Sequence, residues 1–203
     1  MRKSSNKKVW WIIGFLILVA LVIIFLKNNQ NNVEISQSIT PTPTIAQATG
    51  SSGGTLILGK RIKISGCISL DGLPDKACTP GETDPNVTQD NILKTICVSG
   101  YTKTVRPSVS YTQPLKFKIM QEYGDTDSSK NYELDHLISL ELGGSPTSEA
   151  NLWPEPYNIT YNAREKDRVE NYLHREVCSG KMSLKDAQLK ISNNWKEIYK
   201  ILP

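Results

Sequence analysis

Two neighbouring residues, Asp135 and His136, combine a carboxylate with one of only two histidines in a chain of 203 residues. They lie in an apolar, strand-like run that ends at Gly143-Gly144, and a second strand is expected to begin at Asn151. A carboxylate can hold a hard cation, and an imidazole titrates near neutrality and can take a proton from water. The pair therefore favours metal-assisted hydrolysis of a phosphodiester bond.

Adjacent side chains of a strand point to opposite faces, so Asp135 and His136 reach one phosphate only at a bend or at a strand end. A third group is expected from the start of the following helix, where Asn158 and Asn162 both offer amide oxygens to a metal. Asn151 is better placed to brace the strand and orient the histidine. Mg²⁺ is the expected cation because it prefers oxygen ligands, with Mn²⁺ or Zn²⁺ as alternatives.

The surrounding pattern predicts an α+β domain that positions these residues. Apolar residues at helical spacing follow the second strand, and β-branched residues with partial alternation mark the start of the domain. The elements expected are one or two strands within 56–70, a short helix capped by Thr88, a helix at 112–124, strands at 134–142 and 151–153, a helix at 163–178 and a last helix from Ser183.

Composition divides the chain into attachments and one domain. The segments expected are a basic tail (1–8), an apolar membrane-spanning helix (9–26), a disordered linker (27–55) and a folded domain (56–203). Basic residues before the apolar run place the N-terminus in the cytoplasm and the domain outside it. The alternative is a cleaved signal peptide, which would release a secreted protein; no small-residue cleavage site follows the run.

The cysteines fit an oxidising compartment. All four, Cys67, Cys78, Cys97 and Cys178, lie in the folded domain, and an even count there favours two disulfides whose pairing the sequence does not decide. Zinc is the competing interpretation, but the chain has no Cys-x-x-Cys pair and neither histidine is spaced in sequence to complete such a site.

The net charge of +4 belongs to the first 55 residues, so the domain itself is neutral and only a local patch can bind phosphates. The densest basic group without nearby acids is the best candidate for such a patch, and basic residues near the start of the 163–178 helix are further candidates. These residues are Lys103, Arg106, Lys116 and Lys118 in the first group and Arg164 and Lys166 in the second.

The order of motifs resembles the HNH endonucleases, also called ββα-metal or His-Me finger nucleases. The likeness covers 132–195, with the finger at about 131–180, and the lead-in at 100–107 and 115–124 is similar to that of secreted bacterial members. The resemblance implies that His136 is the general base, Asp135 a metal ligand and Asn151 the residue that orients the histidine. By spacing from Asn151, Asn162 suits the last ligand position better than Asn158.

The resemblance implies an endonuclease with a ββα-metal core, acting on DNA more than on RNA, and the apolar N-terminal segment adds that it is membrane-tethered with its domain outside the cytoplasm. Sequence-independent cleavage is expected because no elements for base readout are present, and no obligate protein partner is implied. The chain departs from many members in lacking cysteine pairs for a structural zinc around the finger. The alternatives are a non-catalytic module that binds nucleic acid or envelope polymer and a hydrolase of another phosphoester.

Overall fold

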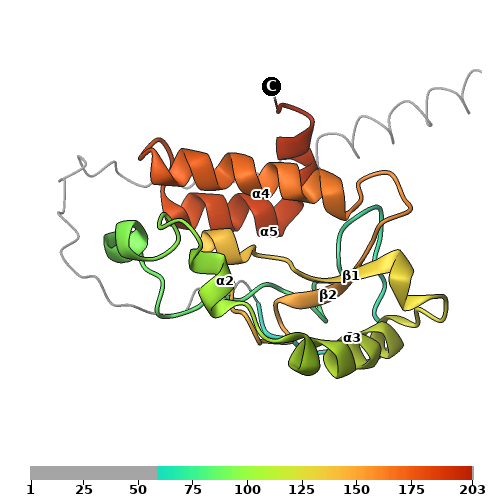
Figure 1. Cartoon of the computed structure of the whole chain (residues 1–203). Coiled ribbons are helices and arrows are strands. Elements are labelled where there is room, and N and C mark those ends of the chain that lie inside the picture. Colours follow the sequence, from blue (N-terminus) through green and yellow to red (C-terminus); the bar gives the residue numbers. More distant parts are fainter. Residues whose placement is uncertain (1–58, 203) are drawn as a thin grey trace, which may run out of the picture. The chain divides into compact units, whose positions relative to one another are not determined.

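The computed structural model describes residues 59–202, which form an α+β domain (Figure 1). Five-residue strands pair at its centre, and helices of 15 and 16 residues cover them. In chain order the elements are the 3₁₀ helix η1 (Gln89–Lys94), α2 (Tyr101–Val105), α3 (Val109–Tyr123), η2 (Ser129–Asn131), β1 (Tyr132–His136), η3 (Leu140–Leu142), β2 (Leu152–Pro156), α4 (Ala163–Cys178) and α5 (Leu184–Tyr199).

The strands β1 and β2 form an antiparallel sheet in which Asp135 lies opposite Trp153 and His136 opposite Leu152. Helix α3 packs against β2 on one side, while α4 and α5 lie side by side on the other (Figure 1). The predicted order of strand, Gly-Gly turn, strand and helix is therefore present. The first strand is shorter than expected because the chain leaves it at His136 and forms η3 before the turn.

The predicted β-rich segment at the start of the domain is wrong. Residues 59–70 contain no strand; Leu70 forms only an isolated bridge with Leu73. The alternation of Ile62 and Ile64 misled the prediction, because these side chains are 76% and 69% exposed and so face no core. The segment is held instead by backbone hydrogen bonds to the carbonyl of Ala77 and by a disulfide.

The expected membrane-spanning helix at 9–26 is not part of the described structure. No helix within 59–202 is long and apolar enough to cross a bilayer. The proposed tail, span and linker, at 1–8, 9–26 and 27–55, lie outside the described residues.

Local capping signals explain where the two long C-terminal helices begin. The side chain of Asn162 accepts a hydrogen bond from the backbone of Arg164 and starts α4, and Ser183 caps α5 in the same way through Asp186. Both starts agree with the sequence. Helix α3 begins three residues before the expected position, at Val109, because Ser108 precedes it in an extended conformation.

Two buried apolar clusters hold the sheet in place. The larger lies between α4, α5 and η1 and includes Leu173, Ile191 and Trp195. The smaller lies between α3 and β2 and includes Ile119 and Trp153. The sheet's two faces therefore meet different cores, and the site residues lie at their border.

The prediction of two disulfides is confirmed. Cys67 pairs with Cys78, and Cys97 pairs with Cys178 across a sequence separation of 81 residues. The longer link joins the segment after η1 to the end of α4. Because closing a longer loop removes more entropy from the unfolded chain, the second disulfide should stabilise the fold more than the first. Its total contribution is roughly 4–5 kcal/mol.

Candidate active site

The two residues singled out first lie at the end of β1, where their side chains diverge. His136 is the last residue of the strand and contacts the loop that follows, whereas Asp135 contacts α4. The sequence allowed either a bend in the strand or a strand end at this pair, and the structure places the pair at a strand end. A ligand at this end can meet both side chains although they leave opposite faces of the strand.

A backbone carbonyl fixes the orientation of His136 and decides which of its ring nitrogens donates. Its Nε2 lies 3.1 Å from the carbonyl oxygen of Pro146, and since a carbonyl only accepts, Nε2 carries the proton and Nδ1 has the free lone pair. Burial lowers the pKa of His136 below its usual value, against the opposing effect of Asp135. A neutral ring with a free nitrogen at neutral pH is what a general base requires.

Asn151 fixes the loop that carries the Pro146 carbonyl. Its side chain is fully buried, accepts a hydrogen bond from the backbone nitrogen of Ile138 at 2.9 Å, and donates to the carbonyls of Ile138 and Ser145, each at 3.0 Å. Ser145 directly precedes Pro146, so this amide positions the group that holds His136. Asn151 can therefore brace His136, as expected, through the Ser145-Pro146 segment.

The Gly-Gly turn lets the loop close this tightly. A Cβ atom on Gly144 would lie 1.7 Å from the carbonyl oxygen of Ile138, a distance that no side chain tolerates. Gly143 has a φ of 69°, in the left-handed region, and its Cβ would clash with Val87. Any other residue at Gly144 would therefore displace the backbone that Asn151 binds.

On the other face, Asp135 belongs to a buried cluster of charges around Lys166. The Lys166 ammonium donates to Asp135 Oδ2 at 2.5 Å, to the carbonyl of His136 at 2.9 Å and to Glu170 on the next turn of α4. Its side chain is 1% exposed. All three ammonium protons are thereby used within the protein, so Lys166 ties the end of β1 to α4 and has no donor left for a substrate phosphate.

Two further acids surround Lys166. Glu155 is 1% exposed, and burial raises its pKa well above the usual range, which favours the protonated form that can donate a hydrogen bond to Asp135. Burial also raises the pKa of Glu170 to about 7, although Lys166 opposes this shift. The sequence did not indicate a role for Glu155 in the site or a connection between Glu170 and Lys166. The sequence signal that could have linked Glu170 to Lys166 is their four-residue spacing, which puts both side chains on one helix face.

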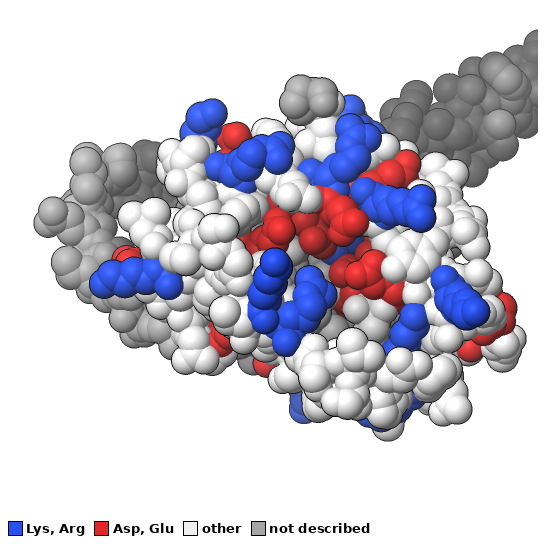
Figure 2. Space-filling model, viewed as in Figure 1, with Lys and Arg blue, Asp and Glu red and all other residues white. Residues whose placement is uncertain are grey.

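The surroundings of Asp135 suit a cation. Burial and then the negative charge of Asp135 raise the pKa of both Glu133 and Asp167, although Lys166 opposes the shift in each case. Figure 2 shows acidic side chains gathered at the centre of this face with lysines and arginines around them. These carboxylates are hard oxygen donors, the kind of ligand that a divalent cation such as Mg²⁺ prefers.

The carboxylates are not drawn together into a closed metal site. Within 59–202, one group of three histidine, cysteine or acidic ligands has all its ligand atoms within 4.8 Å of one another, and it lies elsewhere, at Cys97, His174 and Cys178. A cation at Asp135 would therefore draw in neighbouring acids as it binds.

The two asparagines expected to complete the metal shell have other contacts. Asn162 Oδ1 accepts from Arg164, and its Nδ2 donates to the carbonyl of Ile159, so its amide is engaged in starting α4. Asn158 is exposed and donates to Asn131. Their role as ligands stays a prediction, and for Asn162 it would require the helix cap to open.

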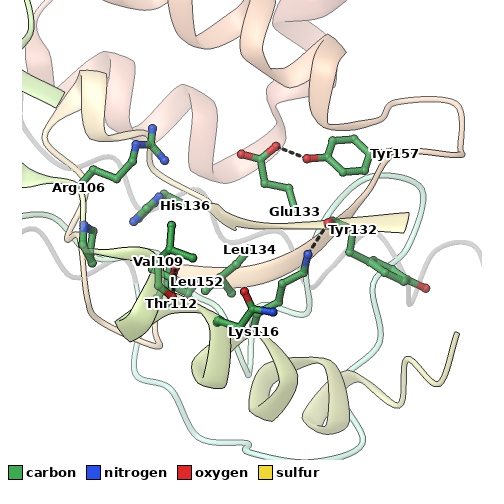
Figure 3. A pocket seen from close by; sticks show the side chains of 12 residues that line it. Arg106, Val109, Thr112, Lys116, Tyr132, Glu133, Leu134, His136, Leu152 and Tyr157 are labelled. Atoms are coloured by element: carbon green, nitrogen blue, oxygen red, sulfur yellow. Dashed lines mark hydrogen bonds between the residues drawn. The ribbon is translucent and has the colours of Figure 1, made fainter. Parts of the chain in front are cut away.

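A cavity of about 300 Å³ lies beside His136 (Figure 3). Its walls are partly apolar, with Val109, Leu134 and Leu152, and partly polar, with Glu133 and Arg106. Arg106 and His136 both line this cavity, so a ligand in it can meet both side chains. The positive charge of Arg106 also contributes to lowering the pKa of His136.

The other basic residues proposed for substrate binding differ in their surroundings. Lys103 and Arg164 are exposed and free to meet a nucleic acid, as is Arg106. Lys116 donates to the carbonyls of Ser129 and Tyr132, and Lys118 pairs with Glu149, so the patch is smaller than the sequence suggested.

Comparison of the chain with models of known protein families, with curated proteins and with solved structures finds no match. The resemblance to HNH nucleases therefore stays a prediction from the sequence motif.

Proposed function

We propose that this protein is a metal-dependent endonuclease that hydrolyses phosphodiester bonds of nucleic acid, DNA in the first place. The observation that carries the proposal is His136, a buried neutral imidazole held through Nε2 by the Pro146 carbonyl beside a cavity that Arg106 borders. A base next to a cation at the end of a strand matches the requirements of phosphodiester hydrolysis.

The chain's own residues account for the proton and the phosphate. His136 Nδ1 takes a proton from a water in the cavity, and the resulting hydroxide forms a bond to phosphorus while the bond to the leaving oxygen breaks. Arg106 pairs with a non-bridging oxygen of the phosphate, as a planar donor suited to such anions. The imidazolium then returns its proton to solvent or to the leaving oxygen.

Asp135, with Glu133 and Asp167 beside it, would hold the divalent cation. When bound there, it supplies positive charge to the departing 3′ oxygen. Lys166 and the protonated Glu155 keep Asp135 in position, and the pairing with Lys166 keeps it ionised, which is the form that binds metal.

The chemistry of the surface favours a nucleic-acid backbone without base recognition. Lys103, Arg106 and Arg164 are the exposed cations proposed to contact it, and contacts to phosphates carry no sequence information. The two disulfides support a place of action in an oxidising, extracytoplasmic compartment.

Incubation of the purified full-length chain with supercoiled plasmid, single-stranded DNA and RNA tests the proposal. Cleavage is expected with Mg²⁺ or Mn²⁺ and is abolished by EDTA. Arg106→Ala should reduce kcat/KM by roughly tenfold or more, the scale of one charge-assisted hydrogen bond, whereas Arg175→Ala, an exposed arginine of α4, should not. Binding of DNA without cleavage would favour the non-catalytic module, and hydrolysis of small phosphoesters alone would favour the other hydrolase class.

A further inference from the structure

A second constellation lies at the far end of α4 from Asn162 and is independent of the nuclease proposal. One ligand atom from each of Cys97, His174 and Cys178 lies within 4.8 Å of the others. His174 and Cys178 are four residues apart on α4, so they share one helix face. Cys97 comes from the segment after η1 and completes the group across the disulfide.

His174 is oriented as a metal-binding histidine usually is. Its Nε2 lies 2.9 Å from the carbonyl oxygen of Ile96, so this nitrogen is the donor and Nδ1 keeps the lone pair. Ligating histidines commonly donate their other ring N–H to a carbonyl or carboxylate, which fixes the tautomer.

A cavity of about 220 Å³ adjoins the group, bordered by Cys97, His174 and Glu141. The Oε2 atom of Glu141 is buried and has no hydrogen-bond partner within 59–202. A buried carboxylate oxygen without a partner, on a residue that lines the same cavity as Cys97 and His174, is costly unless a cation or a water meets it. This is a second observation, separate from the cysteines, that points to a ligand in the cavity.

We propose that reduction of the Cys97–Cys178 disulfide creates a binding site for a thiophilic divalent cation, Zn²⁺ foremost, with Cys97, Cys178 and His174 as ligands. Two thiolates and one imidazole are a common zinc set, and water or Glu141, which lines the same cavity as Cys97 and His174, can supply the fourth ligand. The Cα atoms of the two cysteines are 5.6 Å apart. The sulfurs need to separate only to roughly 3.8 Å, the span of two Zn–S bonds of about 2.3 Å at a tetrahedral angle.

The chemistry of the switch is balanced with a dithiol or phosphine as reductant. The S–S bond accepts two electrons and two protons and gives two thiols, while the reductant is oxidised. Binding of the cation then releases the two thiol protons to solvent and forms two metal–sulfur bonds. Disulfide and metal site use the same sulfur atoms and exclude each other.

The site gives the reduced chain a substitute for its longer disulfide. Every chain is synthesised with thiols, so the metal-binding form is available before oxidation. Either link joins the segment after η1 to the end of α4. The sequence did not reveal the site because Cys97 is distant in the chain and only the fold brings it to the other two.

Titration of the reduced full-length chain with Co²⁺ as probe, without oxygen, tests the proposal. One Co²⁺ per chain should give thiolate charge-transfer and tetrahedral d–d absorption that Zn²⁺ displaces, and Zn²⁺ should raise the melting temperature of the reduced chain. His174→Ala, which keeps both thiols, should bind at least about tenfold more weakly.

The oxidised chain serves as the first control and should show none of this absorption. The double variant Cys67→Ser/Cys78→Ser, which removes the other pair, should retain the spectrum after reduction. If that variant does not fold, the comparison of reduced wild type with His174→Ala decides. Equal affinity in these two, or equal affinity in oxidised and reduced chains, would overturn the proposal.

Discussion

The two faces at the end of β1 hold their catalytic candidates by different means. On one face a short loop holds His136 through neutral hydrogen bonds, from Asn151 to the loop and from the imidazole to the Pro146 carbonyl. On the other face Asp135 is held by charge, through Lys166 and the protonated Glu155. Adjacent residues in the chain thus depend on separate environments.

The difference suits the roles proposed for the two groups. A general base has to be neutral, and burial lowers the pKa of His136. A metal ligand has to be ionised, and a buried carboxylate remains so only beside a positive charge, which the Lys166 ammonium provides. Substitutions in the loop should therefore act through its shape, whereas substitutions in the cluster around Lys166 should act through charge and depend on pH.

Lys166→Met breaks the charged face and should have the largest effect on stability. The variant leaves Asp135 and Glu170 buried without their cation, which typically costs about 3–5 kcal/mol. Urea unfolding monitored by circular dichroism measures the loss. As a control, Lys185→Met, at an exposed position of α5, should change the free energy of unfolding little. An equally small loss for Lys166→Met would contradict the claim that Lys166 compensates the buried charges of Asp135 and Glu170.

Glu170→Gln sharpens the comparison through pH. Because the folded-state pKa of Glu170 is raised from 4.5 to about 7, its proton stabilises the folded protein fully below about pH 4.5, and this contribution is lost as the pH rises to about 7. The glutamine variant lacks the effect. The difference in free energy of unfolding between wild type and variant should shift in favour of the variant over this range, on the order of 3 kcal/mol at 1.4 kcal/mol per pKa unit. Parallel pH profiles of the two proteins would refute the raised pKa.

Asn151→Ala tests the neutral face and should have the smallest effect on stability. It leaves buried backbone groups of Ile138 and Ser145 unpaired, which costs roughly 1–3 kcal/mol with no dependence on pH. Nuclease activity should fall further than this loss implies, because the Pro146 carbonyl moves. Asn171→Ala, which changes an exposed asparagine on α4, is the matched control. Equal activity of the two variants would show that the position of the loop does not matter for catalysis.

The sequence revealed the loop because its determinants are local. Gly143, Gly144 and Asn151 lie within nine residues, and each is required by turn geometry or by hydrogen bonds inside that stretch. The starts of α4 and α5 were predictable for the same reason, since Asn162 and Ser183 act on their own helices.

The charged cluster and the N-terminal segment depend on tertiary contacts and were missed. Lys166 seemed to be a surface residue near a helix start, because a sequence does not show that Asp135 and Glu155 meet it from the sheet. Residues 59–70 alternate as a strand would, but the Cys67–Cys78 disulfide and the turn at Ala77 hold them in an irregular path.

The pH dependence of nucleic-acid cleavage by wild type and His136→Ala tests the central claim most directly. With Mg²⁺ present, kcat/KM of the wild type should rise with pH and level off with an apparent pKa below 6.5, as burial of His136 requires. His136→Ala should be slower by about two to four orders of magnitude, the usual scale for a general base, and should lack this acidic limb while melting as a folded protein. Cleavage by the variant at nearly the wild-type rate, with the same limb, would contradict the account.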